Sequence, residues 1–126
     1  MREVLALALA GAAGSLSRYG VGLLAERWCA SSLPCGTLVV NVVGAFLLGV
    51  LVQVGLAVPS FSRPVQLALS TGFLGAFTTF STFSLETVQL MERGAYGWAG
   101  LNLALNLALG LPAAWLGMVA ARSVMS

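Results

Sequence analysis

An arginine stands inside an apolar segment of this sequence, where it is one of few side chains that could do chemistry. Arg18 follows an uncharged run from Val4 to Ser17 and is followed by further apolar residues up to Ala25. An ionisable group inside a membrane span is costly and usually functional, and a buried fixed cation concentrates anions around it. Alternatively, its long side chain extends to the membrane interface.

Uncharged hydrogen-bond donors occur in the other apolar segments. Asn41 lies inside the second segment and offers an N–H donor without charge. Asn102 and Asn106 are four residues apart, so they share one face of a helix. Their alternative role is hydrogen bonding between helices. Ser81 and Thr82 add hydroxyl donors in the third segment.

Two phenylalanines complete the set of candidate site residues. Phe80 and Phe83 are three residues apart and share a face where the chain is helical. The positive edge of an aromatic ring can face an anion, although core packing is the simpler reading of this spacing. An arginine, amide and hydroxyl donors and ring edges together suit a small anion better than a cation or an apolar drug. Glu86 can be read as marking the membrane interface.

The segment that carries these phenylalanines has an unusual composition. Residues 70–84 read STGFLGAFTTFSTFS, with two glycines followed by threonine, serine and phenylalanine. This composition favours a helix poorly, and irregular backbone at membrane depth is tolerated only inside protein or beside a wet cavity. We therefore predict a third span that unwinds near its middle, at Gly72, Gly75 and the pair Thr78–Thr79. The alternative is an ordinary helix with a hydroxyl-rich packing face.

The elements that must position these residues follow from the distribution of charge. Charged residues divide the 126-residue chain into four apolar stretches, which predict spans at about 4–28, 36–58, 64–91 and 96–121. A helix needs roughly 20 apolar residues to cross a bilayer, so each stretch is long enough. The connections are short, so we expect one all-α transmembrane domain over residues 1–126, with both termini on one side of the membrane.

The composition excludes several classes of function. Hydrophobic residues make up 59% of the chain and charged residues only 8%, so it could not cover a water-soluble globule. The six arginines and four glutamates are accompanied by no lysine, aspartate or histidine. This set argues against an enzyme and against a zinc site. The net charge of +2 is too small and scattered for a nucleic-acid partner.

Two further features concern processing and cysteine chemistry. We expect Cys29 and Cys35 to be free, although their spacing would allow a disulfide. Residues 5–13 could pass for part of a secretory signal peptide. We expect no cleavage, because Glu3 offsets Arg2 and apolar residues resume after Arg18.

Counting arginines gives no preferred orientation in the membrane. Three fall on the side of the termini and three on the opposite side. The first group is Arg2, Arg63 and Arg122, and the second is Arg18, Arg27 and Arg93. Because excess cytoplasmic Lys and Arg normally sets orientation, an unbiased chain can insert both ways and pair antiparallel. Four short helices enclose little polar space, which also favours a site built from two copies.

Three stretches resemble the CrcB/Fluc family of fluoride channels. They are residues 11–19 (GAAGSLSRY), 36–44 (GTLVVNVVG) and 72–86 (GFLGAFTTFSTFSLE), and the resemblance covers nearly the whole chain. It implies an antiparallel, dual-topology homodimer with two fluoride pathways in the cytoplasmic membrane of a prokaryote. It also implies one structural, untransported sodium ion on the twofold axis, held by the backbone carbonyls of Gly75 and Thr78 from both subunits.

The same resemblance assigns roles along the pathway. Phe80 and Phe83 match the ring-edge positions, Asn41 the pore amide and Arg18 the cation at the pathway entrance. Asn102 and Asn106 are the best candidates for the polar track of the fourth span. The expected function is passive fluoride export: HF enters a cell, dissociates and leaves the anion trapped unless a channel releases it.

Two other functions remain open on the sequence. A small multidrug transporter also has four spans, but its proton-coupled mechanism needs a buried carboxylate in the first span. Here that span holds Arg18, and its acids, Glu3 and Glu26, lie at its ends. A non-conducting assembly subunit fits the hydrophobicity and leaves the polar residues unexplained.

Overall fold

The computed structural model describes residues 1–29 and 32–126, and over these residues the chain is helical without any strand. Three helices are long and apolar enough to cross a membrane: α1 (Arg2–Trp28), α2 (Cys35–Ala57) and α6 (Tyr96–Met125). The expectation of an all-α membrane protein is therefore confirmed. Their bounds differ from the spans expected at 4–28, 36–58 and 96–121 mainly in the C-terminal extension of α6.

Between α2 and α6 the chain forms four shorter helical pieces. They are α3 (Arg63–Leu67), the π-helical turn η1 (Ala68–Leu74), α4 (Gly75–Phe77) and α5 (Phe80–Glu92). Between α4 and α5, Thr78 and Thr79 are extended, with φ and ψ of −84° and 158° for Thr78 and −153° and 117° for Thr79. The expectation of unwinding at Gly72 and Gly75 is wrong, because both glycines have helical neighbours and conformations.

Gly72 is better explained by close packing than by flexibility. A Cβ atom added there would lie 2.9 Å from Cβ of Ala10 and 3.0 Å from the carbonyl oxygen of Leu7. The absence of a side chain thus lets η1 approach α1. A similar contact joins α2 to α6, where a Cβ on Gly117 would collide with the carbonyl of Phe46. These small residues set the spacing of the helices.

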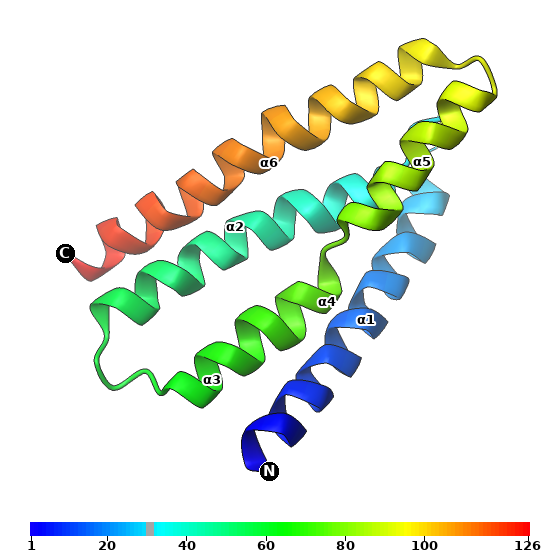
Figure 1. Ribbon diagram of the computed structural model, residues 1–126. Helices are drawn as coiled ribbons and strands as arrows, with labels where there is room; N and C mark the ends of the chain where they lie inside the picture. Colours follow the sequence, from blue (N-terminus) through cyan, green and yellow to red (C-terminus); the bar gives the residue numbers. More distant parts are fainter. Residues whose placement is uncertain (30–31) are drawn as a thin grey trace.

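The chain runs back and forth through its helices, with α2 and α6 nearly alongside each other and α1 oblique to them (Figure 1). α6 packs chiefly on α2, and α1 packs chiefly on η1 and α4. Both termini lie toward the end of the bundle that also holds the connection between α2 and α3. At the opposite end, Gly94 (φ 74°) closes α5, with Ala95 N–H bonded to Leu90 O. This Schellman turn reverses the chain into α6.

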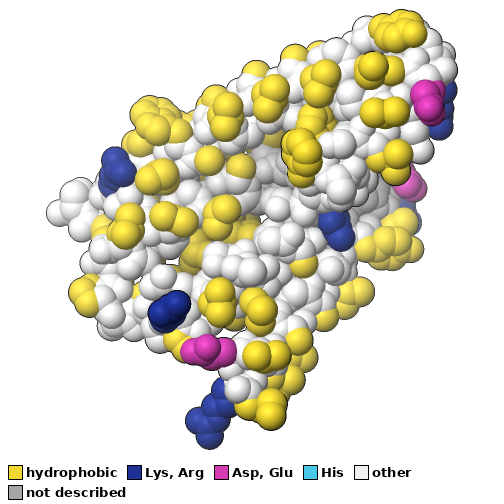
Figure 2. Space-filling view, viewed as in Figure 1, with side chains coloured by type: hydrophobic (Ala, Val, Ile, Leu, Met, Phe, Trp, Pro, Cys, Tyr) yellow, Lys and Arg dark blue, Asp and Glu magenta, His cyan; other side chains and the backbone are white. Residues whose placement is uncertain are grey.

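The outer surface is largely apolar, and few side chains form an interior core. Figure 2 shows hydrophobic side chains spread over the visible face and charged groups confined to scattered positions. The buried core cluster consists of Val40, Leu74 and Phe77, whereas large residues such as Trp115 lie exposed. A single chain in water would leave this apolar area unburied, so lipid or another protein surface must cover it.

A disulfide joins the end of α1 to the start of α2. Cys29 and Cys35 are bonded, with their Cα atoms 6.3 Å apart. The expectation that both cysteines are free is therefore wrong. The six-residue separation permits a bridge on the sequence alone. The bond forms because the end of α1 and the start of α2 lie side by side.

Candidate functional site

An asparagine side chain holds the extended residue between α4 and α5. Asn41 projects from α2 and accepts a hydrogen bond from Thr79 N–H through Oδ1 at 2.8 Å. Its Nδ2 donates to the carbonyl oxygen of Thr79 at 3.1 Å. The N–H of Thr79 lacks a helical partner, whereas its carbonyl, as that of the N-cap residue, accepts the first hydrogen bond of α5. Buried backbone polar groups need partners, and the amide of Asn41 supplies one to the N–H and a second donor to the carbonyl.

The hydroxyl of Thr79 organises the first turn of α5. Thr79 is the N-cap residue, and its Oγ1 accepts from Thr82 N–H at 3.2 Å. The same hydroxyl donates to Thr82 Oγ1 at 2.9 Å and lies 3.3 Å from Ser81 Oγ. A threonine N-cap typically stabilises a helix by about 1 kcal/mol. The expected hydroxyl residues Ser81 and Thr82 are thus brought together around Thr79.

The carbonyl groups of residues 75–78 lose their usual helical donors at this interruption, and for two of them the structure shows where the donor goes. In a continuous helix, Thr79 N–H would bond to Gly75 O and Thr82 N–H would bond to Thr78 O. Here the first donor bonds to Asn41 Oδ1 and the second to Thr79 Oγ1. Gly75 and Thr78, the residues whose carbonyls the family resemblance implies as ligands of a cation, are therefore among those whose carbonyls are released.

A cavity of about 490 Å³ opens on one side of Thr79. Arg18, Thr82 and Glu86 line it, together with residues near both ends of the disulfide. Among the described residues Arg18 forms no ion pair, so its charge remains available inside this cavity. Glu86 is half-buried, and one of its oxygens accepts from Thr37 Oγ1 at 2.8 Å. Glu86 therefore belongs to the cavity wall rather than marking only an interface.

A second cavity, of about 310 Å³, lies beside the interruption. Its wall includes Asn41, Gly75, Thr78 and Phe80. Thr79 lines this cavity as well as the first. Thr79, held by Asn41, therefore lies between the cavity lined by Arg18 and the cavity lined by Gly75 and Thr78.

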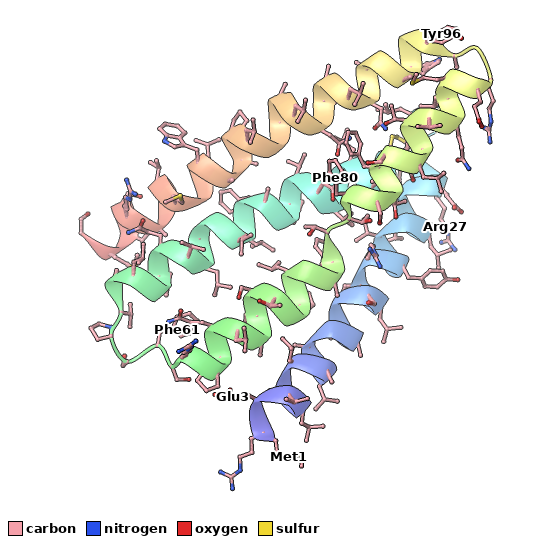
Figure 3. All side chains as sticks on the ribbon, in the orientation of Figure 1. Met1, Glu3, Arg27, Phe61, Phe80 and Tyr96 are labelled. Atoms are coloured by element: carbon pink, nitrogen blue, oxygen red, sulfur yellow. A yellow bond between two sulfur atoms is a disulfide. The ribbon has the colours of Figure 1, made fainter. Side chains whose placement is uncertain are left out.

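The two phenylalanines form an aromatic pair at the start of α5. Their ring centroids are 5.6 Å apart and their planes meet at 62°, an edge-to-face arrangement. Phe80 is 79% exposed, whereas Phe83 is only 6% exposed. Figure 3 labels Phe80 on the first turn of α5, next to the extended segment. The ring of Phe83 is thus packed inside the chain, whereas the ring of Phe80 lies on the outside, where lipid or another protein surface can contact it.

The structure places Asn102 and Asn106 away from both cavity walls. Asn102 is 0% exposed and donates to Thr87 Oγ1 at 2.9 Å. Asn106 Nδ2 donates to Asn102 Oδ1 at 3.1 Å, and Asn106 Oδ1 accepts from Asn41 Nδ2 at 3.0 Å. Their hydrogen bonds join helices, which is the alternative role open on the sequence. Their place on the polar track of an anion pathway stays a prediction.

Thr79 is the functional residue that sequence reasoning missed. The signal was present as the pattern Thr-x-x-Thr over 79–82, which is compatible with a capping threonine. The partnership of Thr79 with Asn41 had no sequence signal, because the two residues are 38 positions apart. Thr37 and Thr87 were missed for the same reason.

Comparison with known proteins places the chain in a family. The family model described as "CrcB-like protein, Camphor Resistance (CrcB)" matches residues 5–118. A protein of Geobacter sulfurreducens named "Fluoride-specific ion channel FluC" is 45% identical over 98% of this chain and 100% of its own length. Relatives of the same name from Dehalococcoides mccartyi and Vibrio vulnificus are also 45% identical. The alignments cover 93% and 88% of this chain, and 90% and 88% of the relatives.

The matched stretch contains α1, α2, the interrupted segment and most of α6, so it includes every residue of the site. The family consists of ion channels and not enzymes. This protein belongs to the CrcB family of membrane proteins, whose similar members carry the name of fluoride-specific ion channels.

Proposed function

We propose that this protein is a fluoride channel through which cytoplasmic fluoride leaves the cell passively, down its electrochemical gradient. The single observation that carries the proposal is the meeting of two cavities at Thr79, one of them lined by the unpaired cation of Arg18. The names of the similar proteins point to the same ion.

The available donors suit a small, strongly hydrated anion. Arg18 would attract anions into the first cavity against the opposing charges of Glu26 and Glu86 in the same wall, and the hydroxyl of Thr82 offers a hydrogen bond there. Ser81 is on the same turn, and the positive ring edges of Phe80 and Phe83 follow along α5. These groups can replace water around the ion without binding it as tightly as a full positive cage would, which is what conduction requires.

We propose that a sodium ion stabilises the interruption through the carbonyls of Gly75 and Thr78. The support is the loss of the normal donors to both carbonyls, because Thr79 N–H and Thr82 N–H bond elsewhere. Carbonyl oxygen is a ligand type that hard cations prefer. Such an ion would supply positive charge to oxygens that have no donor, and it would not be transported.

We further propose that α3, η1, α4 and α5 act as one interrupted third span, the span expected at 64–91. In this arrangement the protein forms an antiparallel homodimer in the inner membrane of a prokaryote. The balanced arginine count supports dual topology. The 79% exposure of Phe80 beside the second cavity supports a partner subunit there. A symmetric partner would double the two released carbonyls to four, a better set for one cation than a single chain offers.

The runner-up functions fit this geometry less well. A proton-coupled drug exporter of the small multidrug type needs a buried carboxylate in its first span, but the carboxylate of α1 that lines the cavity, Glu26, lies in the last turn of the helix, and the ionisable group farther inside is Arg18. An assembly subunit that conducts nothing would have no use for an unpaired arginine in a cavity, where its burial is costly.

The decisive experiment is fluoride efflux from liposomes that contain the purified full-length protein in sodium salt. We expect fluoride to leave far faster than chloride, with an ionophore balancing charge, and to reverse direction with the gradient. Fluoride release no faster than from protein-free liposomes, by a dimer shown to be folded, would refute the channel. Proton exchange driven by an organic cation would favour the drug exporter.

A further inference from the structure

A fully buried amide lies behind the candidate pathway. Asn102 is 0% exposed on α6, and burying an amide is unfavourable unless hydrogen bonds replace those to water. Its Nδ2 donates to Thr87 Oγ1 on α5 at 2.9 Å, and its Oδ1 accepts from Asn106 at 3.1 Å. Thr87 is itself buried and donates to Phe83 O at 2.8 Å. Asn102 therefore has partners on two sides and no access to an ion.

The next amide in the chain of hydrogen bonds has a fixed orientation. Asn106 Nδ2 donates to both the carbonyl oxygen and Oδ1 of Asn102, at 3.0 and 3.1 Å. Both of its amide hydrogens are used, so a reversed side chain would place oxygen against oxygen. Asn106 Oδ1 must therefore point away from Asn102, toward Asn41 Nδ2 at 3.0 Å.

Asn41 receives its own orientation from Asn106. One hydrogen of Asn41 Nδ2 goes to Asn106 Oδ1 and the other to Thr79 O at 3.1 Å, while Oδ1 accepts from Thr79 N–H at 2.8 Å. A reversed Asn41 amide would face the Thr79 N–H with an NH₂ group. The acceptor on Asn106 thus holds Asn41 in the one orientation that satisfies both backbone groups of Thr79.

We propose that Asn102 is a positioning residue of the pathway, which acts through Asn106 and Asn41 to fix Thr79 between the two cavities. This inference rests on the proposed function and gives Asn102 a role other than contact with the anion. Hydrogen bonds in such a chain polarise and orient one another, so a change at the buried end reaches the exposed end. If Asn102 instead only joined α6 to α5, its loss would reduce the number of folded channels and leave each channel unchanged.

Single-channel recording in planar bilayers separates the two roles. Asn102→Leu keeps the branched shape of the side chain and removes both of its hydrogen bonds. We expect the unitary fluoride conductance to fall by a factor of about 2 to 10, which is what one neutral hydrogen bond corresponds to. Ser123→Ala is the control: this hydroxyl is exposed and bonds only within α6, so the conductance should stay unchanged.

A double variant tests whether Asn102 acts through Asn106. Asn106→Leu should also lower the unitary conductance, and adding Asn102→Leu should lower it no further, because contacting residues in one network are non-additive. Independent, multiplying losses would contradict the relay. Thr87→Val removes the two hydrogen bonds of the Thr87 hydroxyl, with Asn102 and with Phe83 O, but keeps those between Asn102 and Asn106, so it should give a smaller loss and remains measurable if Asn102→Leu does not fold.

The outcomes also separate this inference from the function on which it rests. Absence of fluoride current from the unmodified protein would refute the channel itself. Normal current from the unmodified protein, with the same unitary conductance in Asn102→Leu and Thr87→Val, would refute only the positioning role. Fewer active channels of normal conductance would assign Asn102 to helix packing and overturn the proposal.

Discussion

Asn41 and Thr79 exchange two hydrogen bonds across 38 residues of sequence, so that one side-chain amide replaces the helical acceptor of the Thr79 N–H and adds a donor to its carbonyl. The arrangement resembles a short piece of β-sheet pairing made by a side chain. It explains how the backbone between α4 and α5 can leave the helix without exposing unpaired groups. It also gives the candidate pore amide a structural task in addition to any contact with an ion.

Asn41→Leu should therefore damage both stability and transport. The change leaves the N–H of Thr79 without a partner, at about 1–3 kcal/mol for such a buried group, and removes one of the donors to its C=O. Asn41→Asp keeps an acceptor for the N–H and loses the donor, so it should be less destabilising while its negative charge lowers fluoride flux. Thermal unfolding in detergent and liposome efflux measure the two effects. Equal stability of the leucine variant and the unmodified protein would contradict this role.

The aromatic pair allows a test of the ring-edge interpretation. Phe80→Ile and Phe83→Ile preserve apolar volume but remove the positive ring edge, so each should lower fluoride flux about ten-fold or more if an edge contributes roughly 1.4 kcal/mol. Phe83 is buried, so its replacement should also lower the melting temperature, whereas that of the exposed Phe80 should not. Unchanged fluoride flux in both variants would indicate that the two rings serve only in packing.

Sequence reasoning found the helical class and most of the polar residues because each carries a local signal. An arginine in an apolar run and the hydroxyl-rich stretch after Gly75 are visible without any partner. The location of the extended backbone was only partly predicted. Gly72 and Gly75 suggested unwinding by their low helix propensity, but tertiary packing overrides propensity, and η1 packs closely against α1.

The contacts between distant residues were beyond sequence reasoning. No periodicity shows that Asn41 faces Thr79, or that Asn106 lies between Asn102 and Asn41. The direction of each amide depends on three helices meeting at one point. The disulfide was not predicted for a related reason. Its spacing fits a bridge only if the end of α1 lies beside the start of α2.

Removing this disulfide should destabilise the fold measurably. Cys29→Ser together with Cys35→Ser opens the loop between α1 and α2 and should lower the free energy of unfolding by about 2 kcal/mol, the loop-closure entropy for a short loop. Calorimetry or detergent melting with and without a phosphine reductant measures it. The reductant should shift the unmodified protein and leave the double variant unchanged. Two titratable thiols without a shift in melting would refute the stabilising role.

Insertion in both orientations can be read with a topology reporter. Because three arginines lie on each side, a C-terminal reporter should be found on both sides of the membrane in comparable amounts. Two lysines added after Arg122 should bias the C-terminus toward the cytoplasm. Two glutamines at the same place are the matched control and should cause no bias. A reporter found on one side only in the unmodified protein would rule out dual topology.

The released carbonyls lead to a dependence on the cation. Gly75 O and Thr78 O lack their helical donors because Thr79 N–H and Thr82 N–H bond to side chains. Leaving such groups unpaired in a dry environment costs several kcal/mol each. Two antiparallel subunits would bring four of them together at a symmetric position. A small hard cation fits four carbonyl oxygens, and K⁺, being larger, should fit them poorly.

Replacing Na⁺ by K⁺ or by a bulky organic cation on both sides of the membrane, at constant ionic strength, should therefore stop fluoride flux or weaken the dimer. Returning Na⁺ should restore both, because the ion links two chains without any covalent change. Liposome efflux and size-exclusion chromatography measure the two properties on the same preparation. If neither property changes after exhaustive removal of Na⁺, the carbonyls of Gly75 and Thr78 hold no ion. The interruption is then stabilised by Asn41 and the hydroxyl of Thr79 alone.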